Sequence, residues 1–245
     1  MSHLQLEVEQ AGQARAQSTP EQLRHLAFRD RAKDVLLFVF AAVVCFVLTR
    51  ATIAFFHSPD RRLPYSDRFA NSDNAEWTAY GGNWKVENGS MVNESNERGA
   101  KLVEGSPYWA DYTFQADVAL RSAGDAGLIA RVSDAEQGVD AYRGIYVGLR
   151  TRDQALVIGA ADHDWEEYAS YPLSSSIVPN TWYHVRVRLE GCKVDAIVAR
   201  ENSTEVGRAA ITMDSCPLRG RIGLRSYDSG GMWKHIRVTK LSASN

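Results

Sequence analysis

From Pro64 onward, apolar residues recur at every second position, and this period constrains the fold more than any other feature of the chain. In the segment Tyr112–Leu120, alternate residues are apolar and most intervening side chains are polar, as a half-buried strand requires. Residues Thr181–Leu189 repeat the pattern, with Val185 facing inward and Arg186 facing outward. Because this region carries no helical stripe longer than a turn or two, the sequence predicts an all-β domain.

Turn signals rich in glycine, asparagine and proline separate the alternating segments, as at Asn88-Gly89 and Pro179-Asn180. Further strands are expected at Trp84–Val86, Ala100–Val103, Leu128–Val132, Tyr142–Leu149, Ala155–Gly159, Lys193–Ala199, Ala209–Thr212, Ile222–Ser226 and Trp233–Leu241. Many short strands at this spacing predict a two-sheet antiparallel sandwich.

A second constraint is the apolar run Val35–Phe56, which is interrupted only by Arg50. At the rise of an α-helix it spans roughly 33 Å, enough to cross a bilayer once. The run starts too far into the chain and is too long for a cleavable leader, so we expect a retained single-pass transmembrane helix. The expected organisation is a polar N-terminal arm at 1–33 with a short helix from about residue 20, a transmembrane helix at 34–56, a short linker at 57–65 and a β-sandwich at 66–245.

The orientation of the expected transmembrane helix is not set by its flanking charges. Positive residues flank both ends of the apolar run in similar number, so the positive-inside rule favours neither orientation strongly. A short arm, a span and a large C-terminal domain favour a cytoplasmic N-terminus and a domain in the periplasm or outside the cell. The net charge of −2 argues against nucleic acid as a partner.

The three cysteines fall in two different settings. Cys45 lies within the apolar run, where we expect it to act as a small apolar residue. Cys192 and Cys216 flank a segment that reads as strand, turn, strand. Outside the cytoplasm these two residues either form a disulfide or remain two buried thiols.

Landmark residues of the β region occur in a familiar order. They are Trp77, the run Gly82-Asn83-Trp84-Lys85-Val86-Glu87-Asn88-Gly89, Leu102-Val103, Tyr112–Val118, Ala126–Arg131, Trp182–Val187 and Gly220–Arg225. Over nearly all of residues 66 to 241 the chain resembles the concanavalin A-like lectin and glucanase jelly roll, closest to its laminin G-like branch and to the domain labelled 3-keto-disaccharide hydrolase. The resemblance implies a jelly-roll sandwich, but no single activity, because that superfamily holds lectins, hydrolases and purely adhesive domains.

The sharpest catalytic candidates are Asp162, Asp164 and Glu166, which would line one face of a strand if their segment is extended. The resemblance implies that such a comb could supply the nucleophile and the acid of a retaining glucanase, although that family's motif begins with glutamate. A turn through this segment would instead make it a solvated hairpin edge. The Asn-Ser-Gly associated with the 3-keto-disaccharide domain is replaced here by Asp125-Ala126-Gly127, so we expect no catalytic site.

Binding residues are expected among exposed aromatic side chains, because sandwiches of this kind bind sugars or proteins with them. Trp109, Tyr108 and Trp165 fall in expected loops. No cofactor is expected, and no spacing singles out a metal site. The loop carboxylates that could bind calcium in such a fold are Asp125, Asp134, Asp140 and Asp228.

Two functions of different classes remain. The first is a non-catalytic single-pass membrane protein whose domain contacts other membrane proteins of a larger complex, next to the lipid bilayer, as an accessory or structural subunit. The alternative is an envelope glycan-binding, lectin-like module or a glycoside hydrolase. The first function requires a flat apolar patch, whereas the second requires a concave groove with aromatic and carboxylate walls.

Overall fold

The structure is a computed structural model that describes residues 39–46, 63–70 and 76–241. The chain divides into two compact units, Met1–Asp60 and Arg61–Asn245. In the first unit, residues 39–46 form an exposed helix within the expected span. No helix in the described part of the chain is both long enough and apolar enough to cross a membrane. The arm expected at 1–33, the rest of the span and most of the linker lie outside the described residues.

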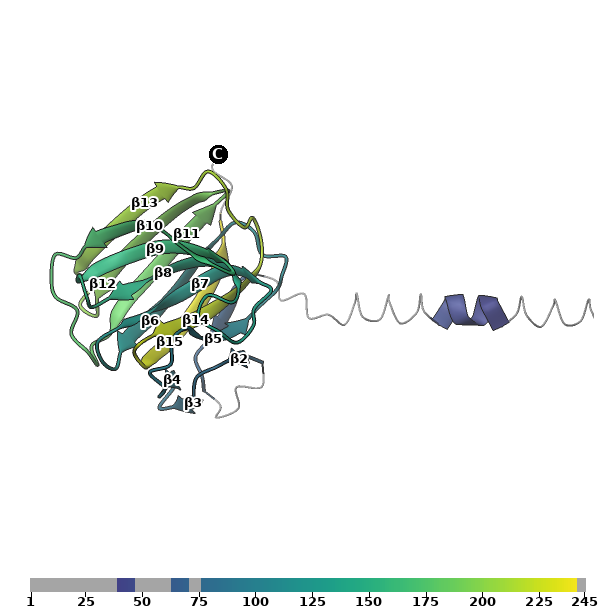
Figure 1. Ribbon diagram of the computed structural model, residues 1–245, viewed down its shortest axis with the longest axis horizontal. Coiled ribbons are helices and arrows are strands. Elements are labelled where there is room, and N and C mark those ends of the chain that lie inside the picture. Colours follow the sequence, from purple (N-terminus) through teal and green to yellow (C-terminus); the bar gives the residue numbers. More distant parts are fainter. Residues whose placement is uncertain (1–38, 47–62, 71–75, 242–245) are drawn as a thin grey trace, which may run out of the picture. The chain divides into compact units, whose positions relative to one another are not determined.

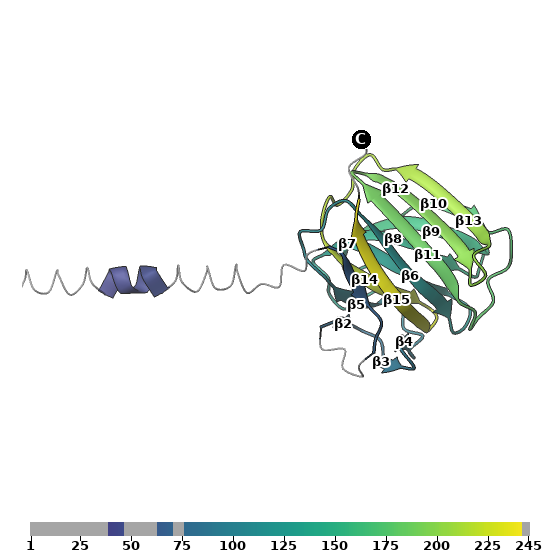
Figure 2. The same ribbon diagram turned by 180° about the vertical axis from the view of Figure 1, so that it is seen from behind.

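The second unit folds into two antiparallel sheets packed face to face (Figure 1; Figure 2). Sheet A consists of β1 (Tyr65–Asp67), β3 (Trp84–Glu87), β4 (Ser90–Asn93), β6 (Tyr112–Leu120), β11 (Tyr183–Glu190), β12 (Lys193–Arg200), β13 (Glu205–Thr212) and β15 (Gly231–Lys240). Its order is β13-β12-β11-β6-β15-β4-β3, and β1 pairs with β15. Sheet B consists of β2 (Thr78–Tyr80), β5 (Ala100–Glu104), β7 (Asp125–Ser133), β8 (Arg143–Arg150), β9 (Ala155–Asp162), β10 (Trp165–Pro172) and β14 (Arg221–Tyr227). Its order is β10-β9-β8-β7-β14-β5-β2, and the predicted two-sheet sandwich is confirmed.

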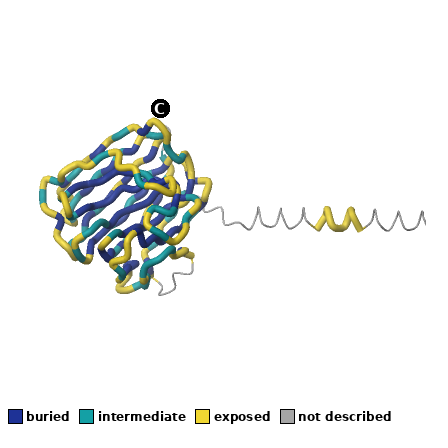
Figure 3. Tube along the Cα trace, in the orientation of Figure 1, coloured by how far each residue is buried: buried dark blue, intermediate teal, exposed yellow. Residues whose placement is uncertain are grey.

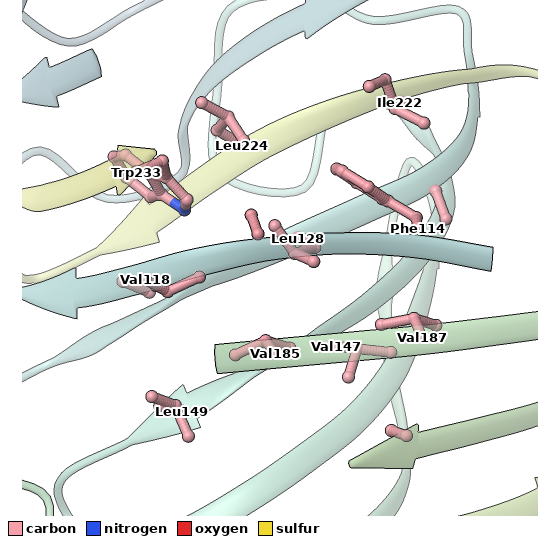
Figure 4. Packing of buried hydrophobic residues seen from close by; sticks show 14 of the residues in the cluster. Phe114, Val118, Leu128, Val147, Leu149, Val185, Val187, Ile222, Leu224 and Trp233 are labelled. Carbon is pink, nitrogen blue, oxygen red and sulfur yellow. The ribbon is translucent and has the colours of Figure 1, made fainter. Parts of the chain in front are cut away.

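The space between the sheets is filled by the inward-facing residues of both. Phe114 and Val118 of sheet A are fully buried there, together with Leu128 and Val147 of sheet B (Figure 4). Burial follows the central strands of the domain (Figure 3). Each such side chain stabilises the fold by about 1.5–3 kcal/mol relative to an exposed position. The two-residue period of the sequence places these side chains on the inner faces, and their burial holds the two sheets together.

Sheet B carries a second apolar cluster on the face that points away from sheet A, so side chains on this face are held in place by packing. The residues of this second apolar cluster are Val103, Ile129, Val132, Tyr142, Tyr146, Ala155, Val157 and Ala161. They alternate along their strands with the residues that face sheet A. As a result β7 and β8 are almost continuously buried, in contrast to the half-exposed β11 of sheet A.

Four strands were not expected from the sequence: β1, β2, β4 and β10. The first three have only three or four residues each, too few to display a period. β10 lies at the edge of sheet B and is largely exposed, so it lacks an apolar alternation. Exposed edge strands of this kind are recognised by their pairing and not by their composition.

Cys192 and Cys216 form a disulfide that joins residues 24 positions apart, with their Cα atoms 5.5 Å from each other. The disulfide alternative is therefore confirmed. Beside it, the buried Arg131 guanidinium donates hydrogen bonds to the carbonyl oxygens of Gly191 and Pro217. The bridge and this arginine together fix the β11–β12 turn to the loop that precedes β14.

We predict that replacing both cysteines, Cys192→Ser with Cys216→Ser, lowers the free energy of unfolding by roughly 3 kcal/mol, because the unfolded chain loses a loop constraint of this size. Urea unfolding of residues 61–245 measures the change. Reductant should destabilise the native domain by a similar amount and leave the double variant unaffected. Equal stability of the two proteins would show that the bridge does not constrain the unfolded chain.

Candidate functional site

A hollow of about 700 Å³ lies over sheet B, and residues of β7, β8, β10 and β14 line it. Ala126 and Leu224 pack in the core between the sheets. Because neighbouring side chains of a strand point to opposite faces, Asp125 and Arg225 point to the other face of sheet B, where the hollow opens. The site is therefore built on strands with a rigid core behind them.

Two glycines lie on adjacent strands of sheet B, two residues along β7 and β8 from Asp125 and Arg150. Gly127 of β7 lies opposite Gly148 of β8 in the sheet register. A Cβ atom at Gly127 would lie 2.4 Å from the Gly148 Cα, and one at Gly148 would lie 2.1 Å from the Tyr146 hydroxyl oxygen. Neither contact is sterically possible, so the absence of side chains here lets larger residues from neighbouring positions lie across the sheet.

Arg225 occupies the centre of the site and is only 3% exposed. Its Nη2 donates a hydrogen bond to Asp140 Oδ1 at 2.7 Å. The guanidinium carbon lies 5.1 Å from the ring centroid of Tyr146 and 5.6 Å from those of Trp165 and Tyr227. Within the described residues, Arg225 Nε and the Tyr146 hydroxyl are buried without a hydrogen-bond partner. Such groups are rare in folded proteins, and two of them lie here beside the hollow.

A second buried cation lies next to Arg225 in the sheet. Lys101 of β5 is fully buried, and its Nζ donates to the carbonyl oxygens of Gly138 at 2.6 Å and Gly99 at 3.1 Å. Burial, with a further contribution from Arg225, lowers the pKa of Lys101 to about 8. Two cations side by side raise the local positive potential under the hollow.

Arg150, at the end of β8, forms the opposite wall of the site. Its guanidinium donates to Asp153 at 2.6 and 2.8 Å, to Glu167 at 2.5 and 3.2 Å, and to the Ser170 hydroxyl at 3.2 Å. The hydrogen bonds from Arg150 hold the pKa of Asp153 at about 2. Arg150 is therefore fully engaged with carboxylates and joins β8 to the edge strand β10.

Asp125 differs from the other carboxylates of the hollow. In the sheet it lies opposite Arg150 on one side and Tyr227 on the other. In the described structure its carboxyl forms neither a hydrogen bond nor an ion pair. Burial raises the pKa of Asp125 to about 6, although the charges of Arg150 and Arg225 oppose this effect. The group can therefore accept or donate a hydrogen bond near neutral pH.

The three aromatic residues expected to bind ligands have different environments. Trp165 lines the hollow, and its ring packs edge-on against Tyr146 with the centroids 5.8 Å apart. Tyr108 is 66% exposed but does not line this hollow. The expectation of an exposed Trp109 is wrong, because this residue is 6% exposed and packs against Tyr65 and Tyr112. Its loop folds back over the end of the core, which local sequence does not reveal.

The acidic comb is not carried by one strand. Asp162 ends β9, Asp164 lies in the turn, and Glu166 belongs to β10. The Asp162 backbone N–H donates to the Asp164 carbonyl at 3.1 Å, so the turn alternative is confirmed. The three carboxylates line a separate hollow of about 600 Å³, where Asp162 pairs with Arg143 at 2.8 Å. Trp165 lines both hollows.

The four candidate calcium ligands are only partly brought together. Asp125, Asp140 and Asp228 line the large hollow, whereas Asp134 does not. Asp140 pairs with Arg225, and Asp228 accepts hydrogen bonds from the Arg98 guanidinium at 2.9 and 3.3 Å. Among the described residues, no three Asp, Glu, His or Cys side chains are arranged to hold a metal ion.

Sequence reasoning missed the arginines and tyrosines of the site. Tyr146 and Arg225 lie within expected strands and Arg150 directly follows one, but none of the three was singled out as a site residue. A signal was present, since β7 and β8 carry apolar residues on both faces and such strands are covered on both sides. That signal points to sheet B but does not reveal which side chains meet there.

Comparison with known proteins agrees with the architecture. Residues 66–239 match the family described as the 3-keto-alpha-glucoside-1,2-lyase-like domain. The chain belongs to this family. No curated protein sequence matches the chain.

Solved structures place the domain within the concanavalin A-like fold. A carbohydrate-binding module, CBM66 from Bacillus subtilis, is 16% identical with a TM-score of 0.55, over 67% of this chain and 96% of that one. The exoplasmic/lumenal domain of VIP36 with Ca²⁺ and Man3GlcNAc is 13% identical with a TM-score of 0.55, over 74% and 92%. A lichenase derived from a mouse hindgut metagenome is 11% identical with a TM-score of 0.53, over 73% and 99%. At these identities the likeness shows the fold alone.

The raised pKa of Asp125 predicts a pH-dependent difference in stability. Since the folded-state pKa of about 6 exceeds the ordinary value of 3.8, the native domain is stabilised by the bound proton below both values and loses this contribution as the pH rises through them. The variant Asp125→Asn should therefore match the native protein at pH 3.5 and exceed its free energy of unfolding by about 2 kcal/mol at pH 7.5. Urea titrations at both pH values measure the difference, and Asp134→Asn is the control. A gain of equal size at both pH values would contradict the prediction.

Proposed function

We propose that the domain binds a saccharide in the hollow over sheet B. The observation that carries the proposal is the hollow itself, which combines the Trp165 ring, the unpartnered Asp125 carboxyl and the buried Arg225. Saccharides present apolar C–H faces, which stack on aromatic rings, and hydroxyl groups, which bond to carboxylates and guanidinium groups. A volume of about 700 Å³ is within the usual range for small-ligand sites.

The hollow favours this function over that of an accessory subunit. Protein contacts alone would require a flat apolar patch, whereas the lining of the hollow is aromatic and charged. The fold is shared with a carbohydrate-binding module, with the VIP36 domain bound to Man3GlcNAc and with a glucanase. These likenesses support saccharide binding over protein contacts. Other membrane proteins of a complex remain a proposal for surfaces outside the hollow.

A second candidate function is proton transfer to or from the bound saccharide. The raised pKa of Asp125 favours this function. A carboxyl whose pKa is about 6 can give or take a proton near neutral pH. The neighbouring Arg225 could stabilise a developing oxyanion. A family described as lyase-like is compatible with such a step. Turnover of a saccharide that stops in Asp125→Asn would assign catalysis to the hollow.

We predict that Trp165→Ala weakens saccharide binding by at least about tenfold, because it removes the largest aromatic side chain that lines the hollow. A glycan array on residues 61–245, followed by calorimetry with the best neutral glycan, measures the loss. The matched control is Tyr108→Ala, which removes an exposed ring outside the hollow and should leave the affinity unchanged. Circular dichroism checks that both variants are folded. Unchanged binding in Trp165→Ala, or the absence of any bound glycan, would refute the function.

We further propose that the apolar run Val35–Phe56 tethers the domain to a membrane, with the N-terminus in the cytoplasm and the domain outside it. The length of the run supports the tether. The disulfide between Cys192 and Cys216 supports an oxidising compartment such as the periplasm or the cell exterior. A saccharide-binding domain in that position would face the glycans of the cell envelope.

Alkaline carbonate extraction tests the tether. The full chain should remain in the membrane pellet, because a spanning helix is held by its apolar length, whereas a variant without residues 35–56 should be released. The orientation is tested by adding protease to cells that have been treated so that the protease reaches the space outside the cytoplasmic membrane but not the cytoplasm. The protease should then digest the domain of the full chain. Release of the full chain by carbonate would rule out the tether, and a protected domain would reverse the orientation.

A further inference from the structure

The charged groups of the hollow over sheet B are almost all paired within the protein. Arg225 is bound to Asp140 at 2.7 Å, and Arg150 is bound to Asp153 and Glu167. Each of these arginines therefore already has a carboxylate partner before any ligand arrives. An acidic ligand would have to compete with a protein carboxylate for either guanidinium.

At the rim of the hollow, one carboxylate is again paired with an arginine, and one further arginine is exposed to solvent. Asp228 is held by Arg98 at 2.9 Å. Arg152 lines the rim and is exposed to solvent, where water and salt weaken its field. The carboxylates that line the hollow are Asp125, Asp140, Glu167 and Asp228, and the lining arginines are Arg150, Arg152 and Arg225. These carboxylates differ in their pairing: Asp140, Glu167 and Asp228 each have an arginine partner, and within the described structure the fourth has none.

Asp125 is the fourth carboxylate of the lining. It is the lining acid that has neither a hydrogen bond nor an ion pair in the described structure, and it lies opposite Arg150 in the sheet. The charged and titratable groups around it are Arg150 and Tyr146 of β8, Arg225 and Tyr227 of β14, and Arg152 and Asp153 of the β8–β9 turn. When Asp125 is ionised, it is the lining carboxylate that no hydrogen bond or ion pair in the described structure neutralises directly.

An ionised carboxylate in this position has a simple chemical preference. It accepts hydrogen bonds from hydroxyl groups, and two neighbouring hydroxyls of a sugar can bond to its two oxygens at once. It repels a ligand carboxylate or sulfate held a few ångströms away, and the partly buried setting strengthens that repulsion relative to bulk water.

We propose that Asp125 is a specificity-determining residue that makes the hollow select neutral, diol-bearing saccharides and reject acidic ones. This inference rests on the proposed saccharide binding and adds the charge class of the ligand and the residue that sets it. The selection weakens in acid, because a protonated Asp125 no longer repels an anion. The pKa of about 6 for Asp125 places this change between pH 7.5 and pH 5.

The test compares ligands that differ only in the carboxylate. The probes are three pairs, the methyl glycosides of glucose, galactose and mannose and the corresponding methyl uronides, titrated into the full chain in detergent and followed by NMR. At pH 7.5 the neutral member of a binding pair should bind at least about tenfold more tightly than its acidic member. In Asp125→Asn, and in the native protein at pH 5, the ratio should fall to within about threefold.

The control is Asp134→Asn, which removes an exposed carboxylate outside the hollow and should preserve the tenfold ratio. Equal binding of both members by the native protein at pH 7.5 would overturn the inference and leave saccharide binding intact. A ratio that survives in Asp125→Asn would assign the selection to another group and overturn it as well. If no member of any pair binds and the glycan array is also blank, the proposed function fails and the inference fails with it.

Discussion

The close approach of Gly127 and Gly148 across β7 and β8 is the constraint that sets how sheet B packs beside the hollow. Because Gly148 has no side chain, the Tyr146 hydroxyl lies where a Cβ atom of that residue would be, and the Tyr146 ring packs between Arg225 and Trp165. The same Gly127 accepts a hydrogen bond from the Trp233 indole at 3.1 Å, which crosses from sheet A to sheet B. Site and core are therefore tied at one residue, and a larger side chain there would disturb both.

Sheet B also carries buried charged and titratable groups at and beside the hollow. Lys101 and Arg225 are buried next to each other, and burial raises the pKa of Asp125. Burying a charge costs free energy unless it is paired, and a buried donor without a partner adds to that cost. Such groups are concentrated at functional sites, where a ligand completes the interactions that the protein alone leaves open. These buried groups are the physical basis for the saccharide binding that we propose at the hollow over sheet B.

Much of the fold was predictable because a strand's two-residue period is a local property. The alternation in Tyr112–Leu120 and Thr181–Leu189 predicted β6 and β11, and the spacing of Cys192 and Cys216 predicted their disulfide as one of two alternatives. The site was predicted only in part. Trp165, expected in a loop, begins β10 and lines the hollow, whereas Trp109 is buried because its loop folds over the core.

By itself, the sequence determined the all-β class, the existence of an apolar run and the inward face of each long strand, because each of these depends on neighbours along the chain. Only the tertiary structure decided that Asp125, Arg150 and Arg225 line one hollow over sheet B. These residues are far apart in sequence, and their contact depends on which strands pair and in which register. A shift of one residue in that pairing would turn the same side chains to the opposite face, so no local pattern could have placed them together.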